Sequence, residues 1–266
     1  MGMTPYAAIA ALLCSAAAHA AVPLPPIGKW GLDQQPDKCV LEHSFGAEGA
    51  ERKLAIIPHP GLNTELLLVL PPDVPIAKGK SDGKVVLLPS GKSYSESVET
   101  IDLGGGISAF SMRIDPAALE VLPTETQMDV SIKSGVDLSL TLPTMKAATS
   151  ALETCLQDMA ARMGVAPGVI RNRQINRASR AKQLDHIGYD AYPDGAEGAS
   201  GEATSLLTIG TDGKVTDCRI TKSSGNAALD ERSCQLQMRF RFPPEHDASG
   251  KAVTSWTFGA MIWHGR

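Results

Sequence analysis

Four cysteines are the residues whose types and spacing most directly suggest chemistry: Cys39, Cys155, Cys218 and Cys234. No two of them have CxxC spacing, and no histidine lies near a pair at zinc-finger spacing, which argues against a structural zinc site. An even number of cysteines in an exported chain instead predicts two disulfides. The count alone leaves three connectivities open.

Motifs for catalysis or phosphate binding are absent from the sequence. No serine stands in a GxSxG context, and no histidine is placed to suggest a catalytic triad. Gly104-Gly105-Gly106 lacks the Lys-Ser/Thr that completes a phosphate-binding loop, so we interpret it as the loop before a strand near Phe110. Asp212 and Asp217 lack the alternating oxygen ligands of a calcium loop. We therefore predict a protein that is not an enzyme and uses no cofactor or metal, and the alternative is an unrecognised hydrolase in the first half.

The first twenty residues have the features of a secretion signal. Residues 1–20 contain no charged side chain, and residues 7–18 form an apolar stretch that includes the fifth cysteine, Cys14. Ala18-His19-Ala20 matches the small-x-small pattern of a signal-peptide cleavage site. The apolar stretch is shorter than the roughly 20 residues that span a bilayer. We predict a cleavable signal peptide over residues 1–20 and a mature chain without a transmembrane anchor, and the alternative is an uncleaved hydrophobic anchor.

The overall charge of the chain does not indicate a particular class of partner, but one segment is strongly basic. The chain has 25 basic and 29 acidic residues, for a net charge of -4, which is not the balance of a nucleic-acid-binding protein. We predict a solvated basic linker at residues 166–187, and the alternative is a contact with anionic lipid or glycan. The cations of this segment are Arg171, Arg173, Arg177, Arg180 and Lys182.

Residues 22–165 have the pattern of a β-rich domain. Short apolar runs at 54–57, 66–70 and 85–88 are bounded by turn-forming residues. Apolar residues then alternate with polar ones along 110–114, 128–132 and 136–142. Because this period of two buries one face of each strand and leaves the other in water, it predicts an antiparallel sheet.

One helix follows these strands. Apolar residues from Met145 to Met163 recur at helical spacing, between Pro143 and Gly164. The spacing predicts a helix that packs its apolar stripe on the sheet. Cys155 lies on that stripe and Cys39 precedes the first strand region, so a Cys39–Cys155 bridge would tie the two ends of the domain together.

Residues 188–266 have the pattern strand, strand, helix, strand. The first two strands, 201–209 and 215–221, flank Asp212-Gly213, a strong hairpin signal. Asn226 is placed to cap a helix over 227–238, and 253–263 alternates as a final strand. Cys218 on the second strand and Cys234 on the helix are placed to form the second disulfide. We therefore predict an α+β protein with an N-terminal β-rich domain and one packing helix, followed by a small domain with an antiparallel sheet.

This last region resembles the TonB C-terminal domain family. The order and spacing of many small motifs carry the resemblance, and they cover about 75 residues. They are Tyr192-Pro193, Gly201, Asp212-Gly213-Lys214-Val215, Cys218, Ser223-Ser224-Gly225, Leu229-Asp230, Phe240, Phe242-Pro243, Gly250-Lys251 and Trp263.

The resemblance implies a function in the periplasm of Gram-negative bacteria. Domains of this family bind the TonB box, a short extended segment of outer-membrane transport receptors, by pairing it with the edge of the last strand. By this resemblance we expect the exported protein to be periplasmic, associated with transmembrane transport, and to have a receptor peptide as its partner. The implied peptide-binding residues are Tyr192, Pro193, Ser255, Trp256, Thr257, Phe258, Gly259, Ala260, Met261 and Ile262.

The sequence also departs from a full energy transducer of the TonB type. It lacks the N-terminal transmembrane anchor and the long Pro/Lys-rich linker of such a transducer, and a β-rich domain stands in their place. Without the anchor we expect no transmission of force from the inner membrane. The alternative function is an envelope structural or interaction protein that uses the same strand edge to form a homodimer.

Overall fold

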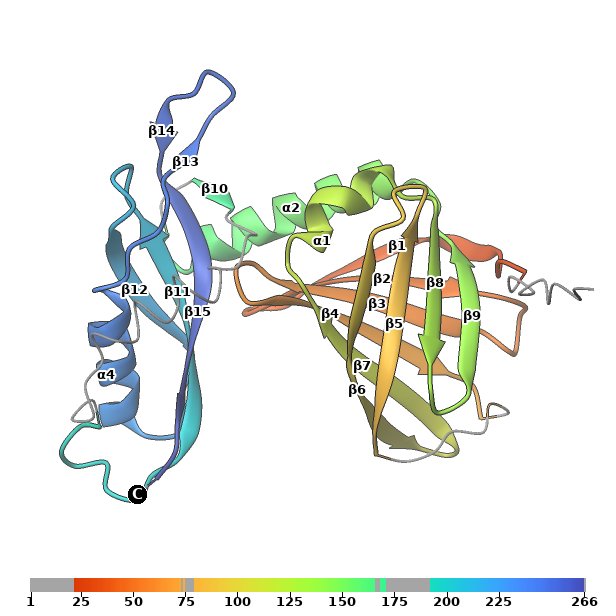
Figure 1. Cartoon of the computed structure of the whole chain (residues 1–266), viewed down its shortest axis with the longest axis horizontal. Helices are drawn as coiled ribbons and strands as arrows, with labels where there is room; N and C mark the ends of the chain where they lie inside the picture. The colour runs from red at the N-terminus through yellow and green to blue at the C-terminus, as the bar shows by residue number, and fades with distance from the viewer. Residues whose placement is uncertain (1–21, 73, 75–78, 166–167, 171–191, 266) are drawn as a thin grey trace, which may run out of the picture.

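The N-terminal region is a nine-stranded antiparallel sheet that curls into a half-barrel (Figure 1). The computed structural model describes residues 22–72, 74, 79–165, 168–170 and 192–265. The strand order is β1-β2-β3-β4-β7-β6-β5-β8-β9. The strands are β1 (Pro26–Gln34), β2 (Cys39–Phe45), β3 (Arg52–His59), β4 (Asn63–Leu70), β5 (Lys80–Leu88), β6 (Ser93–Gly104), β7 (Ile107–Ile114), β8 (Gln127–Ile132) and β9 (Val136–Thr141).

The two edges of the curled sheet are joined by the residues just before β1. Leu24 N donates to Ser139 O at 2.8 Å, and Thr141 N donates to Leu24 O at 3.1 Å. The next residue extends the pairing of β1 with β2, since Gly46 N donates to Pro25 O at 2.9 Å. These bonds satisfy part of two sheet edges that would otherwise offer unpaired backbone groups.

The concave side of the half-barrel holds the main core. Helix α2 (Met145–Arg162) covers one end of it, together with the short helices α1 (Ala118–Val121) and η1 (Leu122–Thr124). The predicted stripe of α2 is buried, as expected. Gly83 in β5 is needed for close packing, because a Cβ at this position would overlap the side chains of Val98 and Met112. The largest fully buried side chains of the half-barrel are Phe45, Phe110, Leu41, Leu54, Ile56, Leu70, Leu87, Leu122, Met128, Leu140 and Leu152.

A disulfide between Cys39 and Cys155 ties β2 to α2. Both cysteines have no exposed surface, and their Cα atoms are 6.2 Å apart. This pairing confirms the prediction. The position of Cys39 differs, because it is the first residue of β2 and does not precede the first strand region. Strands β1, β2 and β6 were not predicted from the sequence. Strand β1 has no clean alternation of buried residues, and β6 is exposed over most of its length.

The C-terminal region is a four-stranded sheet with one helix against it. Its strand order is β10-β15-β11-β12, and the predicted strand-strand-helix-strand order is confirmed. The elements are β10 (Val169–Ile170), β11 (Gly201–Ile209), β12 (Val215–Lys222), α4 (Ala227–Gln237), β13 (Glu245–His246), β14 (Ala252–Val253) and β15 (Ser255–Trp263).

Two details of this sheet differ from the prediction. The final strand begins at Ser255, because Ala252 and Val253 pair separately with β13 in a projecting hairpin. The sheet also gains a parallel strand, β10, from the segment predicted as a linker. The remainder of that segment, residues 171–187, lies outside the described residues, as does the predicted signal peptide, so both stay predictions. In the part of the chain that the structure describes, no helix is long and apolar enough to cross a membrane.

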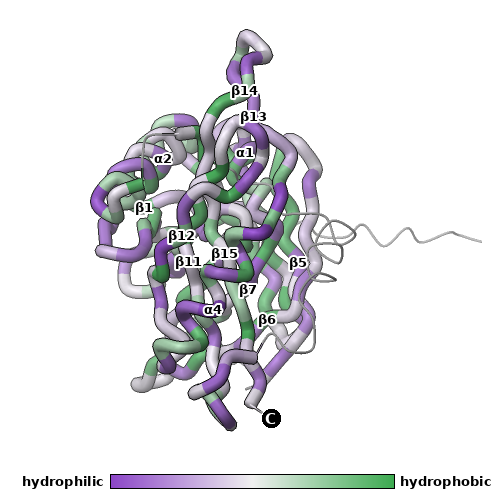
Figure 2. Tube along the Cα trace, turned by 90° about the vertical axis from the view of Figure 1, so that its left-hand side faces the viewer, coloured by the Kyte–Doolittle hydropathy of each residue, from purple (hydrophilic) through white to green (hydrophobic). Residues whose placement is uncertain are grey.

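The two regions lie side by side. Figure 2 shows the C-terminal sheet and α4 in front of the half-barrel. The contact is hydrophobic, since Leu206, Trp256 and Phe258 belong to the same cluster of buried residues as the half-barrel core. The C-terminal sheet therefore buries part of one face against the N-terminal region.

Candidate functional site

Strand β15 has one fully paired edge and one partly paired edge. On the first edge it pairs with β11 over its whole length, from Ser255 opposite Ile209 to Trp263 opposite Gly201. On the second edge it pairs with β10 only at Ser255 and Trp256. Within the described residues, the second edge from Gly259 to Trp263 has no neighbouring strand. The site predicted from the sequence is therefore divided into two halves.

The direction of the backbone groups of β15 follows from two hydrogen bonds on the second edge. Val169 N donates to Thr254 O at 3.0 Å, and Phe258 N donates to Pro60 O at 2.8 Å. In an antiparallel pair, alternate residues direct both their N–H and C=O groups to the same side. The backbone groups of Ala260 and Ile262 therefore also point away from β11, toward the edge without a neighbouring strand.

The first half of the edge is covered by the turn between β3 and β4. Pro60 O accepts hydrogen bonds from Phe258 N and from Thr257 Oγ1, the latter at 3.0 Å. The next residue of the turn, Gly61, has a φ of +81°, and a Cβ there would overlap Thr257 Oγ1 and lie 3.2 Å from Thr257 Cβ. Glycine is thus needed at this position both for the backbone conformation and for the close approach to β15.

The side chains of the first half are buried between the two regions. Trp256 is 1% exposed and Phe258 is 5% exposed, and their rings are in edge-to-face contact. Trp256 Nε1 donates to Gln157 Oε1 of α2 at 3.2 Å, and Gln157 Nε2 donates to Gly168 O at 2.9 Å. Gln157 thereby links the helix, the segment that leads into β10 and the start of β15. Both aromatic side chains are therefore core residues.

His59, the residue before the turn, contacts one ring of this pair, Phe258. Its ring lies 6.2 Å from that of Phe258, edge to face. Burial lowers the pKa of His59 below its ordinary value, since the charged form loses hydration. The nearby charges oppose one another, because Glu65 and Asp37 raise the pKa whereas Arg113 and Lys38 lower it. His59 is therefore held toward its neutral form at the boundary between the regions.

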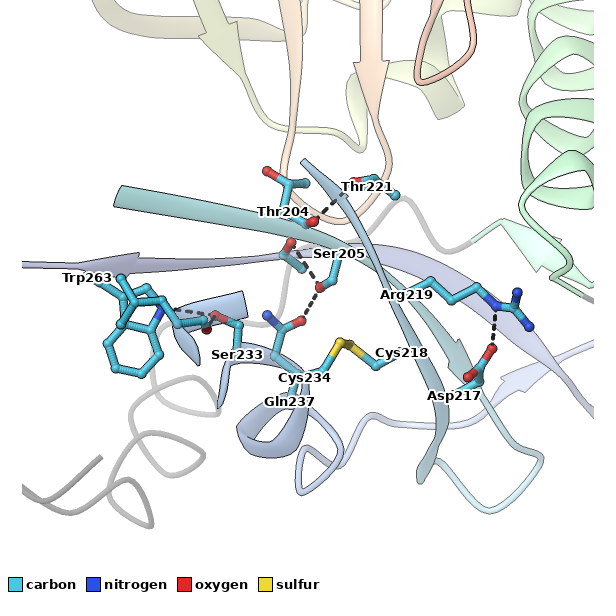
Figure 3. Close-up of a disulfide and its surroundings, with 12 residues drawn as sticks. Thr204, Ser205, Asp217, Cys218, Arg219, Thr221, Ser233, Cys234, Gln237 and Trp263 are labelled. Atoms are coloured by element: carbon cyan, nitrogen blue, oxygen red, sulfur yellow. Dashed lines mark hydrogen bonds and ion pairs between the residues drawn. A yellow bond between two sulfur atoms is a disulfide. The ribbon is translucent and has the colours of Figure 1, made fainter. Parts of the chain in front are cut away.

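The second half of the edge has an exposed face and a buried face. Ile262 is 62% exposed and lies opposite Glu202 of β11, which is also exposed. On the other face, Trp263 packs under α4 and donates from Nε1 to Ser233 Oγ at 2.9 Å (Figure 3). Met261 packs against the same cluster of buried residues. This half is thus supported by α4, and its backbone edge has no neighbouring strand in the part of the chain that the structure describes.

Tyr192 and Pro193 lie at the end of this second half. The ring of Tyr192 is in edge-to-face contact with that of Trp263, at 5.7 Å between ring centroids. Its Oη lies 2.7 Å from Ala196 O and also contacts Ala199 O. Pro193 is half-buried beside it. The structure thus brings Tyr192 together with the last strand, at Trp263, which was not among the predicted binding residues.

The disulfide Cys218–Cys234 holds α4 on the sheet (Figure 3). Both cysteines are half-buried, and their Cα atoms are 5.6 Å apart. The predicted pairing is confirmed. Nearby, Ser205 Oγ donates to Gln237 Oε1, and both of these side chains are fully buried. These contacts fix the helix whose inner face supports Trp263.

Sequence reasoning missed the residues that cover the first half of the edge. These are Pro60, Gly61, Gln157 and the segment 168–170. Pro60-Gly61 does stand between two predicted strands, so a turn was foreseeable from residue types. Nothing local indicated that this turn would meet a strand almost 200 positions later. In the described part of the chain, no group of three or more His, Cys, Asp or Glu side chains is arranged to hold a metal ion.

Comparison with known proteins agrees with this geometry for the C-terminal region. Residues 189–262 match the family model described as the Gram-negative bacterial TonB protein C-terminal. The match covers just over a quarter of the chain. No curated protein and no solved structure matches the chain.

The C-terminal region therefore contains a TonB C-terminal domain. This domain family is non-enzymatic and implies a TonB-like interaction with a receptor. Together with the two disulfides, the match points to the Gram-negative cell envelope. The half-barrel is assigned to no family.

Proposed function

We propose that this protein binds an extended peptide segment of an outer-membrane transport receptor by strand addition to β15. The proposed binding edge is Gly259–Trp263, the half of the strand without a neighbour among the described residues. The observation that carries the proposal is the outward direction of the backbone groups of Ala260 and Ile262. An unpaired edge in a TonB C-terminal domain supports strand addition because it offers donors and acceptors in register for a peptide.

The strength of such binding follows from the number of groups available. Ala260 and Ile262 together offer two N–H and two C=O groups. At a net gain of about 0.5–1.5 kcal/mol per hydrogen bond, four bonds contribute roughly 2–6 kcal/mol before the cost of ordering the peptide. Since a millimolar Kd corresponds to about 4 kcal/mol, backbone pairing alone gives weak binding. Side-chain contacts must therefore supply the remaining affinity and the selectivity.

The surroundings of this half-edge indicate which side chains would add affinity. Alternate side chains of an added strand lie on opposite faces of the sheet. On one face they would lie beside the exposed Ile262, and on the other beside Tyr192 and Trp263. We therefore expect a peptide with apolar or aromatic residues at alternate positions. The protein would act in the periplasm as a binding protein and not as an enzyme.

The test is an NMR titration of the mature protein with a synthetic peptide copied from the TonB-box segment of a receptor of the same bacterium. Strand addition predicts shifts of the Ala260 and Ile262 amides and slower exchange of their protons. The Ala260→Pro variant removes one outward N–H donor and leaves the β11 ladder intact, because this N–H faces away from β11. We expect it to weaken binding at least tenfold.

The matched control is Ala260→Val, which changes the side chain at the same position and keeps the N–H. A loss of affinity of less than about threefold is expected for this variant. Equal losses in both variants would contradict strand addition. If the same amides shift with protein concentration in the absence of peptide, the edge pairs with a second copy, as in the alternative homodimer.

A further inference from the structure

The turn between β3 and β4 binds β15 in the way that a ligand strand would. Pro60 O accepts the Phe258 N–H at 2.8 Å on the same edge that Ala260 and Ile262 leave open. We propose that this turn, Pro60-Gly61, is a built-in competitor that a receptor strand must displace in order to extend its pairing along β15 from Gly259 to Thr257. This inference rests on the proposed function and adds a mode of regulation to it.

The contact is specific to the two residues of the turn. Pro60 O accepts from both Phe258 N and Thr257 Oγ1, so one carbonyl satisfies two donors of β15. Gly61 allows the approach, because any side chain at this position would overlap that of Thr257. His59 adds the ring contact with Phe258. The turn therefore fits β15 through backbone, side-chain and packing contacts together.

The same turn is an incomplete substitute for a strand. A proline has no N–H, so Pro60 accepts from the edge and donates nothing back to it. A peptide strand paired at this position would both accept from and donate to β15, as in a regular ladder. A strand paired at Phe258 replaces the bond from Phe258 N and adds one to Phe258 O in place of the bond from Thr257 Oγ1, so the exchange costs no net hydrogen bond and the turn is displaceable.

The remainder of the first half is held by a separate contact. Strand β10 pairs with Ser255 and Trp256, and Gln157 bonds to both Gly168 O and the Trp256 ring. The side chains of Trp256 and Phe258 lie in the shared core of the two regions. Displacing the turn opens the backbone edge at Phe258 and leaves these contacts in place.

Ligand length then decides whether competition occurs. A peptide of five residues fits beside Gly259–Trp263 and does not reach the turn. A peptide of seven residues extends along Thr257–Trp263, overlaps Pro60 at Phe258 and stops before the residues paired with β10. The proposal predicts that weakening the turn contact improves binding of the long peptide and leaves binding of the short one unchanged.

The test uses Gly61→Ala with a matched control, Gly91→Ala. Gly91 also has a positive φ, +70°, but a Cβ there meets nothing within 4 Å. The two variants thus share the backbone strain, and only Gly61→Ala has the clash with Thr257. We expect Gly61→Ala to speed exchange of the Phe258 amide at least tenfold and to raise affinity for the seven-residue TonB-box peptide at least fivefold. Gly91→Ala should change neither quantity.

A second variant tests the contact without backbone strain. Thr257→Val removes the hydroxyl that bonds to Pro60 O and keeps the shape of the side chain. Its control is Thr216→Val on β12, where the hydroxyl bonds to Thr208 O at 3.4 Å, far from the turn. Thr257→Val should speed exchange of the Phe258 amide and raise affinity for the longer peptide, as in Gly61→Ala, but by a smaller factor.

The outcomes separate this proposal from the proposed function. If the five-residue peptide binds and the seven-residue peptide gains no affinity in Gly61→Ala or Thr257→Val, the competitor role is wrong and strand addition stands. An unchanged exchange rate of the Phe258 amide in both variants overturns the competitor role as well. If neither peptide binds to any variant, the proposed function fails and the competitor role fails with it.

Discussion

The half-barrel and the TonB C-terminal domain achieve stability in different ways. The half-barrel buries one large core between nine strands and α2, and its disulfide is wholly inside that core. The C-terminal domain has two small clusters of its own, one under α4 and one near Val215 and Phe242. Its largest buried side chain, Trp256, belongs to the core of the half-barrel. The small domain thus depends on its neighbour for part of its core.

This difference has a consequence for function. The face of the sheet at Leu206, Trp256 and Phe258 is used for packing, and the edge beside it is occupied by Pro60. Only the part of β15 that does not touch the half-barrel offers a backbone edge within the described residues. The half-barrel therefore supports the domain and at the same time limits which part of β15 a partner can reach.

The largest expected effect is the loss of the Cys39–Cys155 disulfide. The double variant Cys39→Ser, Cys155→Ser removes a link across 116 positions, which the chain-entropy model values at about 4–5 kcal/mol. Urea unfolding followed by hydrogen exchange should show the loss in the strands of the half-barrel. Unchanged stability of β2 and α2 would contradict the idea that this link holds the two ends of the half-barrel together.

A smaller loss is expected for the second disulfide. Cys218 and Cys234 are 16 positions apart, and the same model values their link at roughly 3 kcal/mol. The double serine variant should destabilise α4 and leave β2–β9 unchanged. Because these cysteines are half-buried and the other pair is fully buried, mild reductant should open Cys218–Cys234 first. Mass spectrometry after thiol alkylation would show the order in which the two disulfides are reduced. Reduction of both at the same reductant concentration would contradict this expected order.

Loss of a helix cap should affect the C-terminal domain alone. Asn226 Oδ1 accepts hydrogen bonds from Ala228 N at 2.9 Å and Leu229 N at 3.2 Å at the start of α4. We expect Asn226→Ala to cost about 1 kcal/mol, measured by urea unfolding. Asn226→Asp, which keeps the acceptor, is the control. A loss felt equally in the half-barrel would show that the two regions unfold together.

A milder, reversible effect is expected from pH. Burial lowers the pKa of both His43, inside the half-barrel, and His59, at the boundary. With the folded pKa below the ordinary 6.5, the unfolded chain takes up the proton first as the pH falls. This stability is therefore fully present above about pH 6.5 and is lost below it. Thermal melts from pH 7.5 to 5.0 should show the decline, and His59→Gln should reduce it.

Residues with regular local patterns were predictable from the sequence. The alternation along 128–132 and 136–142 and the stripe from Met145 onward predicted two strands and a helix that the structure contains. The exposed strand β6 was missed because a strand with few buried residues has no alternation to detect. Strand β10 was missed because two residues are too few to show a period.

The sequence by itself determined the α+β class and the match of the last region to a TonB C-terminal domain, since both depend on residue types at short or regular spacing. It also predicted the two disulfide pairings, because two cysteines fall in each predicted domain. Only the tertiary structure decided which half of β15 is covered by the turn between β3 and β4 and by β10. The bond between Thr257 and Pro60 joins residues 197 positions apart. A contact between residues so far apart in the sequence depends on how two folded surfaces meet. It produces no periodic pattern or motif in the sequence around either residue.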